Sequence, residues 1–305
     1  MSQKISMRGV ISCRAVVIAF LLFVSVFVLN PVVIAQNESD IKVGENTISI
    51  KSGTQNRQFI LYIPEGYDGK TALPLVFLFH GTSQTTKQIL MTSDLSNLAN
   101  KKKFILAVPE GIYLYLGMKS WNRDLDPAGV NDVEFVKDII REISSKVAID
   151  KKRIYATGYS GGAMMSSRLG CELPNVIAAI GAVAGLECGK DCRPTHPVSI
   201  IAFHGTADKI LPHLHHEKSL PVWAEKNGCN KTPVTRKISE EVTQISYGGC
   251  KGNAEVVFYR IDGGGHTWPD SPSAEVYEKI GLGKTNKDIN ASNLMWSFFE
   301  GHPLP

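Results

Sequence analysis

The chain alternates between short apolar runs and longer segments whose apolar residues recur at helical spacing. Continuous apolar runs bounded by turn residues are typical of strands that are buried on both faces of a parallel sheet. Helical spacing predicts helices over 86–100, over 131–147, directly after residue 160 and over 288–300. The apolar runs predict strands over 59–63, 75–79, 104–108, 153–157, 178–183, 198–203 and 256–261, with a shorter strand over 47–50. This alternation indicates an α/β fold with a mostly parallel sheet and helices on both faces.

The first 35 residues have a different pattern from the rest of the chain. Residues 1–14 are polar and basic, residues 15–29 form an apolar run, and Asn30-Pro31 ends any helix there. Side chains of small or modest size then precede Gln36. This order is that of a secretory signal peptide, which predicts cleavage after residue 35 and a single catalytic domain over 36–305. An uncleaved membrane anchor is the alternative, although the run is short for a span of about 20 residues.

Composition and charge narrow the class of protein further. With 43% hydrophobic and 20% charged residues, the chain has the composition of an ordinary globular protein. Disordered, collagen-like and coiled-coil chains are thereby excluded. The formal charge is +4, and removal of the three basic residues among the first 35 leaves +1. The predicted mature chain is almost neutral, so its charge gives no indication of nucleic-acid binding.

Predicted export makes the cysteine count informative, because disulfides persist outside the cytosol. Cys13 lies in the predicted signal peptide, and five cysteines remain, which allows two bridges and one free thiol. Cys229 and Cys250 bracket a polar stretch and are the favoured pair, whereas Cys171 can pair with Cys188 or Cys192. The cysteine spacings suit zinc poorly, so we expect no metal site.

The strongest candidate for chemistry is Gly158-Tyr159-Ser160-Gly161-Gly162. It follows a predicted strand and precedes a predicted helix, which is the context of the nucleophile elbow of hydrolases. Glycines permit strand and helix to approach closely, and the Gly161 backbone N–H can donate to an oxyanion. A glycine-rich turn that contains a serine by chance is the alternative reading.

A serine hydroxyl needs a base to accept its proton, and the base needs an acid that orients it. The hydrolase order of serine, acid and histidine nominates Asp208, after the strand over 198–203, and His266, in a glycine-rich loop. A surface-loop role for His266 is the alternative. Asp262 and Asp270 are rival carboxylates, but both lie too close in sequence to His266 to be preferred. The sequence therefore predicts a Ser160–Asp208–His266 triad.

Several further residues are candidates for the surroundings of this triad. The Thr82 backbone N–H, in the loop after the strand over 75–79, is the expected second oxyanion donor. Trp121 and Trp268 lie on predicted loops and Tyr159 adjoins the nucleophile, so these three are candidates for substrate binding. The histidine cluster is expected to be a solvated loop at the pocket rim and not a metal site, and comprises His213, His215 and His216.

Several motifs together resemble the secreted esterase family of polyhydroxybutyrate depolymerases and feruloyl esterases, carbohydrate esterase family 1. They are Leu73-Pro74-Leu75-Val76 with His80-Gly81, Asn131-Asp132-Val133, the segment 153–160, His204-Gly205-Thr206-Ala207-Asp208 and the segment 263–269. The resemblance implies an α/β-hydrolase fold, the Ser160–Asp208–His266 triad and the Cys229–Cys250 bridge. The chain departs from the family at Gly161, where asparagine is frequent, and in the loop after Gly81, which is often richer in glycine.

These observations predict a secreted serine carboxylesterase, extracellular or periplasmic, that works through an acyl-enzyme without a cofactor. Expected substrates are feruloyl or acetyl-xylan esters of plant cell-wall polysaccharide, or hydroxybutyrate oligomers. We expect neither nucleic acid nor, after cleavage, a membrane as partner. A polyhydroxybutyrate depolymerase proper, a peptidase on the same fold, a lipase and a non-catalytic binding protein on a hydrolase fold are the alternatives.

Overall fold

A computed structural model describes residues 41–122 and 129–305, and Ile41–Pro305 forms one unit. The predicted signal peptide lies outside the described residues, so the division of the chain at residue 35 stays a prediction. No helix in the described ranges has both the length and the apolar character needed to span a membrane.

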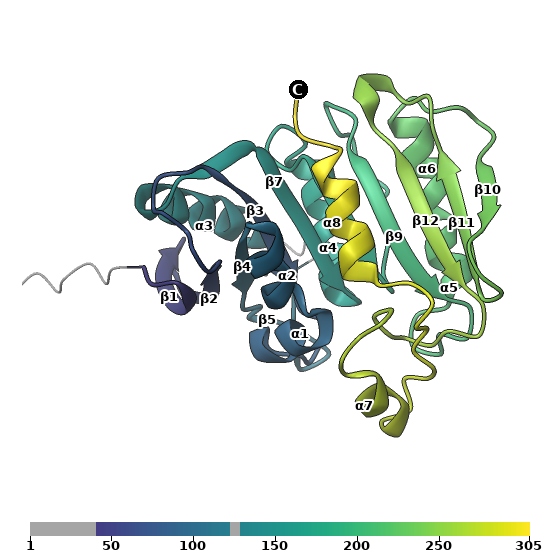
Figure 1. The fold of residues 1–305 in the computed structure, drawn as a ribbon, viewed down its shortest axis with the longest axis horizontal. Coiled ribbons are helices and arrows are strands. Elements are labelled where there is room, and N and C mark those ends of the chain that lie inside the picture. The colour runs from purple at the N-terminus through teal and green to yellow at the C-terminus, as the bar shows by residue number, and fades with distance from the viewer. Residues whose placement is uncertain (1–40, 123–128) are drawn as a thin grey trace, which may run out of the picture. The chain divides into compact units, whose positions relative to one another are not determined.

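The main element of the described residues is a ten-stranded sheet (Figure 1). Its order is β1-β2-β4-β3-β7-β8-β9-β12-β11-β10. The strands from β4 to β12 in that order pair in parallel, whereas both ends of the sheet are antiparallel. The strands are β1 (Gly44–Ser52), β2 (Gln55–Ile63), β3 (Leu73–Phe79), β4 (Ile105–Pro109), β7 (Ile149–Tyr159), β8 (Ala179–Val183), β9 (Ser199–Gly205), β10 (Val234–Lys237), β11 (Val242–Tyr247) and β12 (Val256–Ile261).

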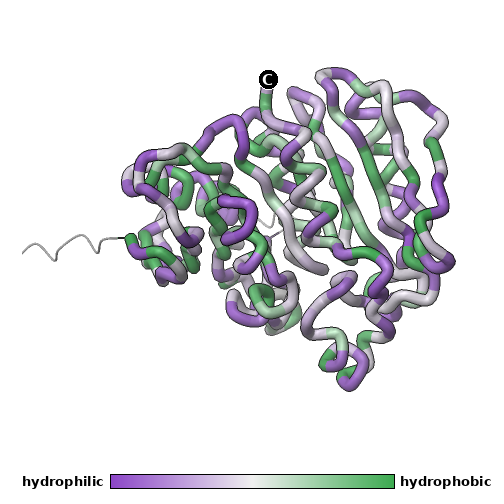
Figure 2. The backbone as a smooth tube through the Cα atoms, in the orientation of Figure 1, coloured by the Kyte–Doolittle hydropathy of each residue, from purple (hydrophilic) through white to green (hydrophobic). Residues whose placement is uncertain are grey.

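Helices cover both faces of the sheet. One apolar cluster joins alternate strand residues to α3 (Asp132–Lys146), α4 (Gly161–Glu172) and α6 (Ser219–Lys226). The other cluster joins the intervening strand residues to α1 (Thr86–Ser93), α2 (Leu95–Lys102) and α8 (Ala291–Glu300). In Figure 1, α8 lies in front of the strands. Figure 2 shows apolar residues along the central strands and polar residues along β10. This two-sided burial explains why the central strands are continuous apolar runs.

The structure differs from the expected elements in four places. The helix expected over 86–100 is two helices, because Asp94 between them adopts the left-handed conformation with φ of 55°. Between the strand expected over 104–108 and the helix expected over 131–147, where no element was expected, lies the hairpin of β5 (Tyr113–Tyr115) and β6 (Met118–Ser120). The strands β10 and β11 were not expected. The helix α6 and the short helices α5 (His213–Glu217) and α7 (Ala274–Lys279) were not expected either.

Two disulfides cross-link the described cysteines. Cys229 pairs with Cys250, as the sequence favoured, and Cys171 pairs with Cys192. Among the described cysteines, Cys188 is the free thiol. Of the two partners that the sequence left open for Cys171, the structure thus selects Cys192.

Candidate active site

Ser160 occupies a strained turn at the carboxyl end of β7. Its backbone has φ of 53° and ψ of −118°, a conformation that non-glycine residues rarely adopt and that clusters at functional sites. The Ser160 N–H donates to the Val183 carbonyl of β8 at 2.9 Å, which fixes the turn to the sheet. A Cβ atom at Gly158 or Gly162 would overlap backbone atoms of Gly162 or Phe79, so both positions require glycine. The sequence thus presents Ser160 at the sheet edge.

Asp208 and His266 form a buried pair at the same edge. The His266 Nδ1–H donates to Asp208 Oδ2 at 2.7 Å, and both residues are buried. The backbone N–H groups of Ile210 and Leu211 donate to Asp208 Oδ1, each at 2.8 Å. Burial opposes ionisation of Asp208, but hydrogen bonds from two histidines and the Leu211 N–H hold its pKa well below the usual range. Asp208 is therefore an ionised partner for His266.

The rival carboxylates lie elsewhere. Asp262 has a side chain that is 46% exposed and lies 3.5 Å from the Arg260 Nε. Asp270 accepts a hydrogen bond from the Asn290 side chain. The carboxylate that meets His266 is the one that the hydrolase order nominated.

Backbone and side-chain contacts hold the His266 loop over the end of the sheet. The His266 N–H donates to the Leu282 carbonyl at 2.7 Å. The Tyr159 hydroxyl donates to the His266 carbonyl at 2.5 Å, and the two rings lie 5.0 Å apart. Since Tyr159 immediately precedes Ser160, this contact brings the histidine loop to the nucleophile elbow. Because Nδ1 of His266 carries the proton that Asp208 accepts, Nε2 is left as an acceptor for a hydroxyl proton.

The two predicted oxyanion donors are also neighbours. A Cβ atom built on Gly161 would lie 3.4 Å from the Thr82 N and 2.8 Å from the Thr82 Oγ1. Gln84 fixes the Thr82 loop, because its side chain accepts from the Gly81 N–H at 2.9 Å. The Thr82 hydroxyl lies 2.8 Å from the Ser120 hydroxyl. The backbone of Gly161, where α4 begins, thus lies close to the backbone of Thr82.

His80 is a structural histidine in this arrangement. Its Nε2 accepts from the Gly111 N–H at 2.9 Å, so Nδ1 carries the proton and donates to the Gly81 carbonyl at 2.8 Å. The ring is fully buried, and burial lowers the pKa of His80, which keeps it neutral. His80 therefore braces the Thr82 loop.

Comparison with known proteins shows the family of this chain. A family model described as Esterase PHB depolymerase matches residues 57–206. Feruloyl esterase B of Piromyces equi is 30% identical over 235 residues, which make up 70% of this chain and 43% of that protein. The chain belongs to the polyhydroxybutyrate depolymerase-like esterase family.

Another relative is also an esterase, and a solved structure shares the fold. The bifunctional acetylxylan esterase/xylanase of Neocallimastix patriciarum is 24% identical over 72% of this chain and 32% of that protein. The chain spans less than half the length of both relatives. The acetyl xylan esterase structure from Aspergillus awamori matches with a TM-score of 0.61 at 17% identity. That match covers 78% of this chain and 99% of the other. The predicted α/β-hydrolase fold is confirmed.

The three candidates for substrate binding in this esterase-family chain are buried instead. Trp121 and Trp268 are each 1% exposed. The Trp121 indole N–H donates to the His80 carbonyl at 2.8 Å, and that of Trp268 donates to the Ser292 hydroxyl at 3.1 Å. Tyr159 is 3% exposed and is engaged with His266. These rings position the loops of the site and offer no stacking face to a ligand, so the expectation is corrected.

The expectation of a solvated histidine cluster is wrong for one of its three members, since His215 is exposed and His213 half-buried but His216 is buried. His216 is 1% exposed, and its Nδ1 lies 2.9 Å from the Leu186 carbonyl. Its ring stacks on His204 with a centroid distance of 5.0 Å. The His204 Nε2 in turn lies 3.0 Å from Asp208 Oδ2. Sequence reasoning missed this contact of the esterase-family site, although His204 precedes Asp208 by four residues at the end of a strand.

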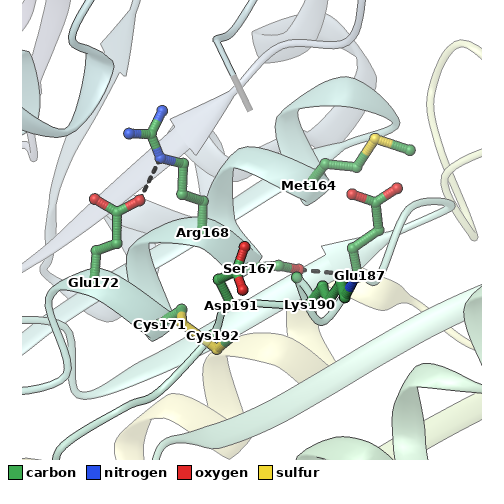
Figure 3. Close-up of a pocket in the computed structure, with 10 residues that line it drawn as sticks. Met164, Ser167, Arg168, Cys171, Glu172, Glu187, Lys190, Asp191 and Cys192 are labelled. Carbon is green, nitrogen blue, oxygen red and sulfur yellow. Dashed lines mark hydrogen bonds and ion pairs between the residues drawn. A yellow bond between two sulfur atoms is a disulfide. The ribbon is translucent and has the colours of Figure 1, made fainter. Parts of the chain in front are cut away.

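A cavity of about 420 Å³ lies along the helix that follows the nucleophile (Figure 3). It begins at Met164, one helical turn after Ser160, and continues along α4 to the Cys171–Cys192 bridge. The Arg168 Nε donates to Glu172 at 2.6 Å, and the Ser167 hydroxyl accepts from the Glu187 N–H at 3.2 Å. Ser160, Asp208 and His266 are not among the residues that line this cavity. It adjoins the helix that follows Ser160 but holds no part of the Asp208–His266 pair.

Proposed function

We propose that this member of the esterase family hydrolyses carboxylic esters through Ser160, His266 and Asp208. One observation carries the proposal. Asp208 and His266 form a buried hydrogen bond. The loop that carries His266 is held by the hydroxyl of Tyr159, which directly precedes the strained turn at Ser160. A nucleophile, a base and an orienting acid in this relation perform acyl transfer on several unrelated folds.

The reaction follows from the positions of the protons. Ser160 Oγ attacks the ester carbonyl carbon while its proton passes to His266 Nε2. The resulting oxyanion accepts from the Gly161 and Thr82 N–H groups. Collapse of this intermediate breaks the bond to the alcohol, which leaves with the proton from His266. Water then attacks the acyl-enzyme by the same route and releases the carboxylic acid and free Ser160.

Asp208 stabilises the charge that develops during this cycle. The imidazolium formed at His266 lies against an ionised carboxylate that is buried and therefore poorly screened. None of these steps uses a metal ion, so a chelator is expected to leave the rate unchanged.

The proposed substrates are esters of the kinds that the relatives' names state. The names of the Piromyces and Neocallimastix proteins indicate feruloyl and acetyl-xylan esters, and the description of the family indicates hydroxybutyrate oligomers. The predicted secretory signal peptide supports an extracellular or periplasmic site of action, where cell-wall polysaccharide esters or polyester oligomers are found. Two disulfides are consistent with that compartment.

The test is turnover of methyl ferulate, acetylated xylan, a 3-hydroxybutyrate oligomer and p-nitrophenyl acetate by the purified chain. We expect hydrolysis by the wild type and by Ser297→Ala, a serine exposed on α8, but none by Ser160→Ala. Cleavage of p-nitrophenyl acetate alone would support the triad and reject the substrate list. A wild type that hydrolyses nothing and that a fluorophosphonate does not label would favour a non-catalytic binding protein.

A further inference from the structure

We infer that His204 is a positioning residue, a neutral second histidine that fixes the Asp208 carboxylate for His266. The inference rests on the proposed function, because it concerns how the acid of the triad is held. His204 would act through Asp208 alone, without contact to the substrate or to Ser160.

Two imidazole rings share one oxygen of Asp208. The His266 Nδ1 lies 2.7 Å from Oδ2, and the His204 Nε2 lies 3.0 Å from the same atom. The other oxygen, Oδ1, accepts the two backbone N–H groups of Ile210 and Leu211. A carboxylate has about four acceptor positions, so these donors occupy both oxygens. Rotation of the carboxylate would break hydrogen bonds on both sides.

The surroundings of His204 determine where its proton lies. Its Nε2 faces two acceptors, Asp208 Oδ2 and the Leu211 carbonyl at 2.9 Å, so Nε2 carries a hydrogen. Its Nδ1 is buried and has no hydrogen-bond partner among the described residues. A second proton on Nδ1 would bury an unpaired N–H on a charged ring, which is strongly unfavourable. His204 is therefore neutral and protonated at Nε2.

A neutral donor has a specific consequence for the triad. A lysine or arginine at this place would cancel the charge of Asp208, and the imidazolium at His266 would lose its electrostatic partner. His204 supplies a hydrogen bond and leaves the negative charge in place. The carboxylate is thus oriented without being neutralised, which suits an acid that must stabilise a cation during the reaction.

The ring of His204 is itself held in place. It stacks on His216 with an interplanar angle of 17°, and both rings are 1% exposed. Burial lowers the pKa of His216 to about 4, so the stacked ring is also neutral near pH 7. The titratable groups that face His204 are Asp208 and His216, while His266 contacts Asp208 and the exposed His215 lies edge-on to His216.

Substitutions of His204 that keep or remove the N–H donor to Asp208 in the absence of the imidazole ring test the inference. In His204→Gln the side-chain amide N–H would lie near the position of Nε2, whereas the side chain of His204→Asn is too short to reach Asp208 in the same way. We therefore compare His204→Gln, His204→Asn and His204→Leu with the wild type, using p-nitrophenyl acetate. We expect His204→Asn and His204→Leu to lower kcat about 10- to 100-fold with little change in KM, and His204→Gln to recover most of the rate.

The pH profile supplies a readout that simple loss of packing would not move. With one donor fewer, Asp208 interacts more strongly with His266, so the acid limb of kcat/KM should move to higher pH in His204→Leu. Equal rates for His204→Gln and His204→Asn at matched thermal stability would overturn the inference, as would an unmoved acid limb. The comparison of rates needs only His204→Gln and His204→Asn, so it can still be made if His204→Leu does not fold. Inactivity of the wild type would instead reject the proposed function.

Discussion

The Tyr159 hydroxyl donates to the His266 carbonyl at 2.5 Å, so the residue before Ser160 holds the loop that carries His266. The two residues are 107 positions apart in the sequence. Burial raises the pKa of Tyr159 well above its usual value, so the hydroxyl remains a donor at any pH at which an esterase would work. This hydrogen bond therefore links the strained turn at Ser160 to the position of the His266 imidazole.

Removal of that hydroxyl should affect the rate more than the fold. In Tyr159→Phe the His266 carbonyl loses its donor, and we expect kcat to fall about 10-fold because the imidazole is less well placed. Tyr277→Phe is the matched control, since its hydroxyl binds Thr92 and its ring stacks on Tyr159. Steady-state kinetics with p-nitrophenyl acetate compare the two. A larger loss of kcat in Tyr277→Phe would show that the loop, and not the hydroxyl, sets the rate.

A second prediction concerns the close approach of Gly161 and Thr82. A methyl group at Gly161 would lie 2.8 Å from the Thr82 hydroxyl oxygen, so Gly161→Ala must shift the Thr82 side chain or its loop. Loss of one oxyanion donor costs about 10²- to 10³-fold in kcat, which sets the expected scale. Thr82→Ala removes the obstructing hydroxyl and keeps the backbone N–H. The double variant should therefore recover activity relative to Gly161→Ala, and purely additive losses would contradict this account.

The sequence predicts the central sheet well, because its strands are buried on both faces and read as unbroken apolar runs. The strand predicted over 256–261 has the bounds of β12. By contrast, β10 is exposed along its whole length at the edge of the sheet, so it has no apolar pattern. The break at Asp94 was not predicted, since helical spacing continues across a single left-handed residue.

The site was predictable where a local motif carries the chemistry. The elbow around Ser160 and the order of acid and base nominated residues that the structure brings to one edge. The roles of Trp121 and Trp268 were not predictable, because each indole bonds to a partner that is far along the chain, at His80 and Ser292. The contact between His204 and Asp208 depends likewise on how the turn after β9 folds back.

A third prediction tests the buried ion pair of Arg57 and Asp132. The Arg57 guanidinium lies 2.8 Å from Asp132 Oδ1, and the Asn122 N–H donates to Oδ2 at 2.7 Å. Either Arg57→Met or Asp132→Asn should lower the free energy of unfolding by about 3–5 kcal/mol, since each leaves a buried charge without its opposite charge. The double variant should lose less than the sum of the single variants.

Urea denaturation of the single and double variants measures these energies. Arg141→Met is the control, because that arginine is exposed where it contacts Glu134, and we expect its stability to be unchanged. Additive losses at Arg57 and Asp132 would show that the pair does not act as a unit.

The last prediction concerns stability at acidic pH. His216 has a pKa of about 4 because burial disfavours its cation, whereas the unfolded residue titrates near its ordinary value of about 6.5. Between these values the unfolded chain binds a proton that the folded chain does not, so stability falls as the pH decreases from about 6.5 to about 4. Below about pH 4 both states bind the proton and this contribution stops changing.

A variant without the imidazole isolates this contribution of His216. His216→Asn can keep a donor to the Leu186 carbonyl and has nothing to titrate. Its stability should therefore depend less steeply on pH in that window than the wild type's, by about 3 kcal/mol over the whole range. Urea denaturation from pH 4 to 7 measures the slopes, with His196→Asn, an exposed histidine, as the control that should match the wild type. Identical slopes for His216→Asn and the wild type would mean that His216 is protonated in the folded chain, and the stack on His204 would then carry a charge.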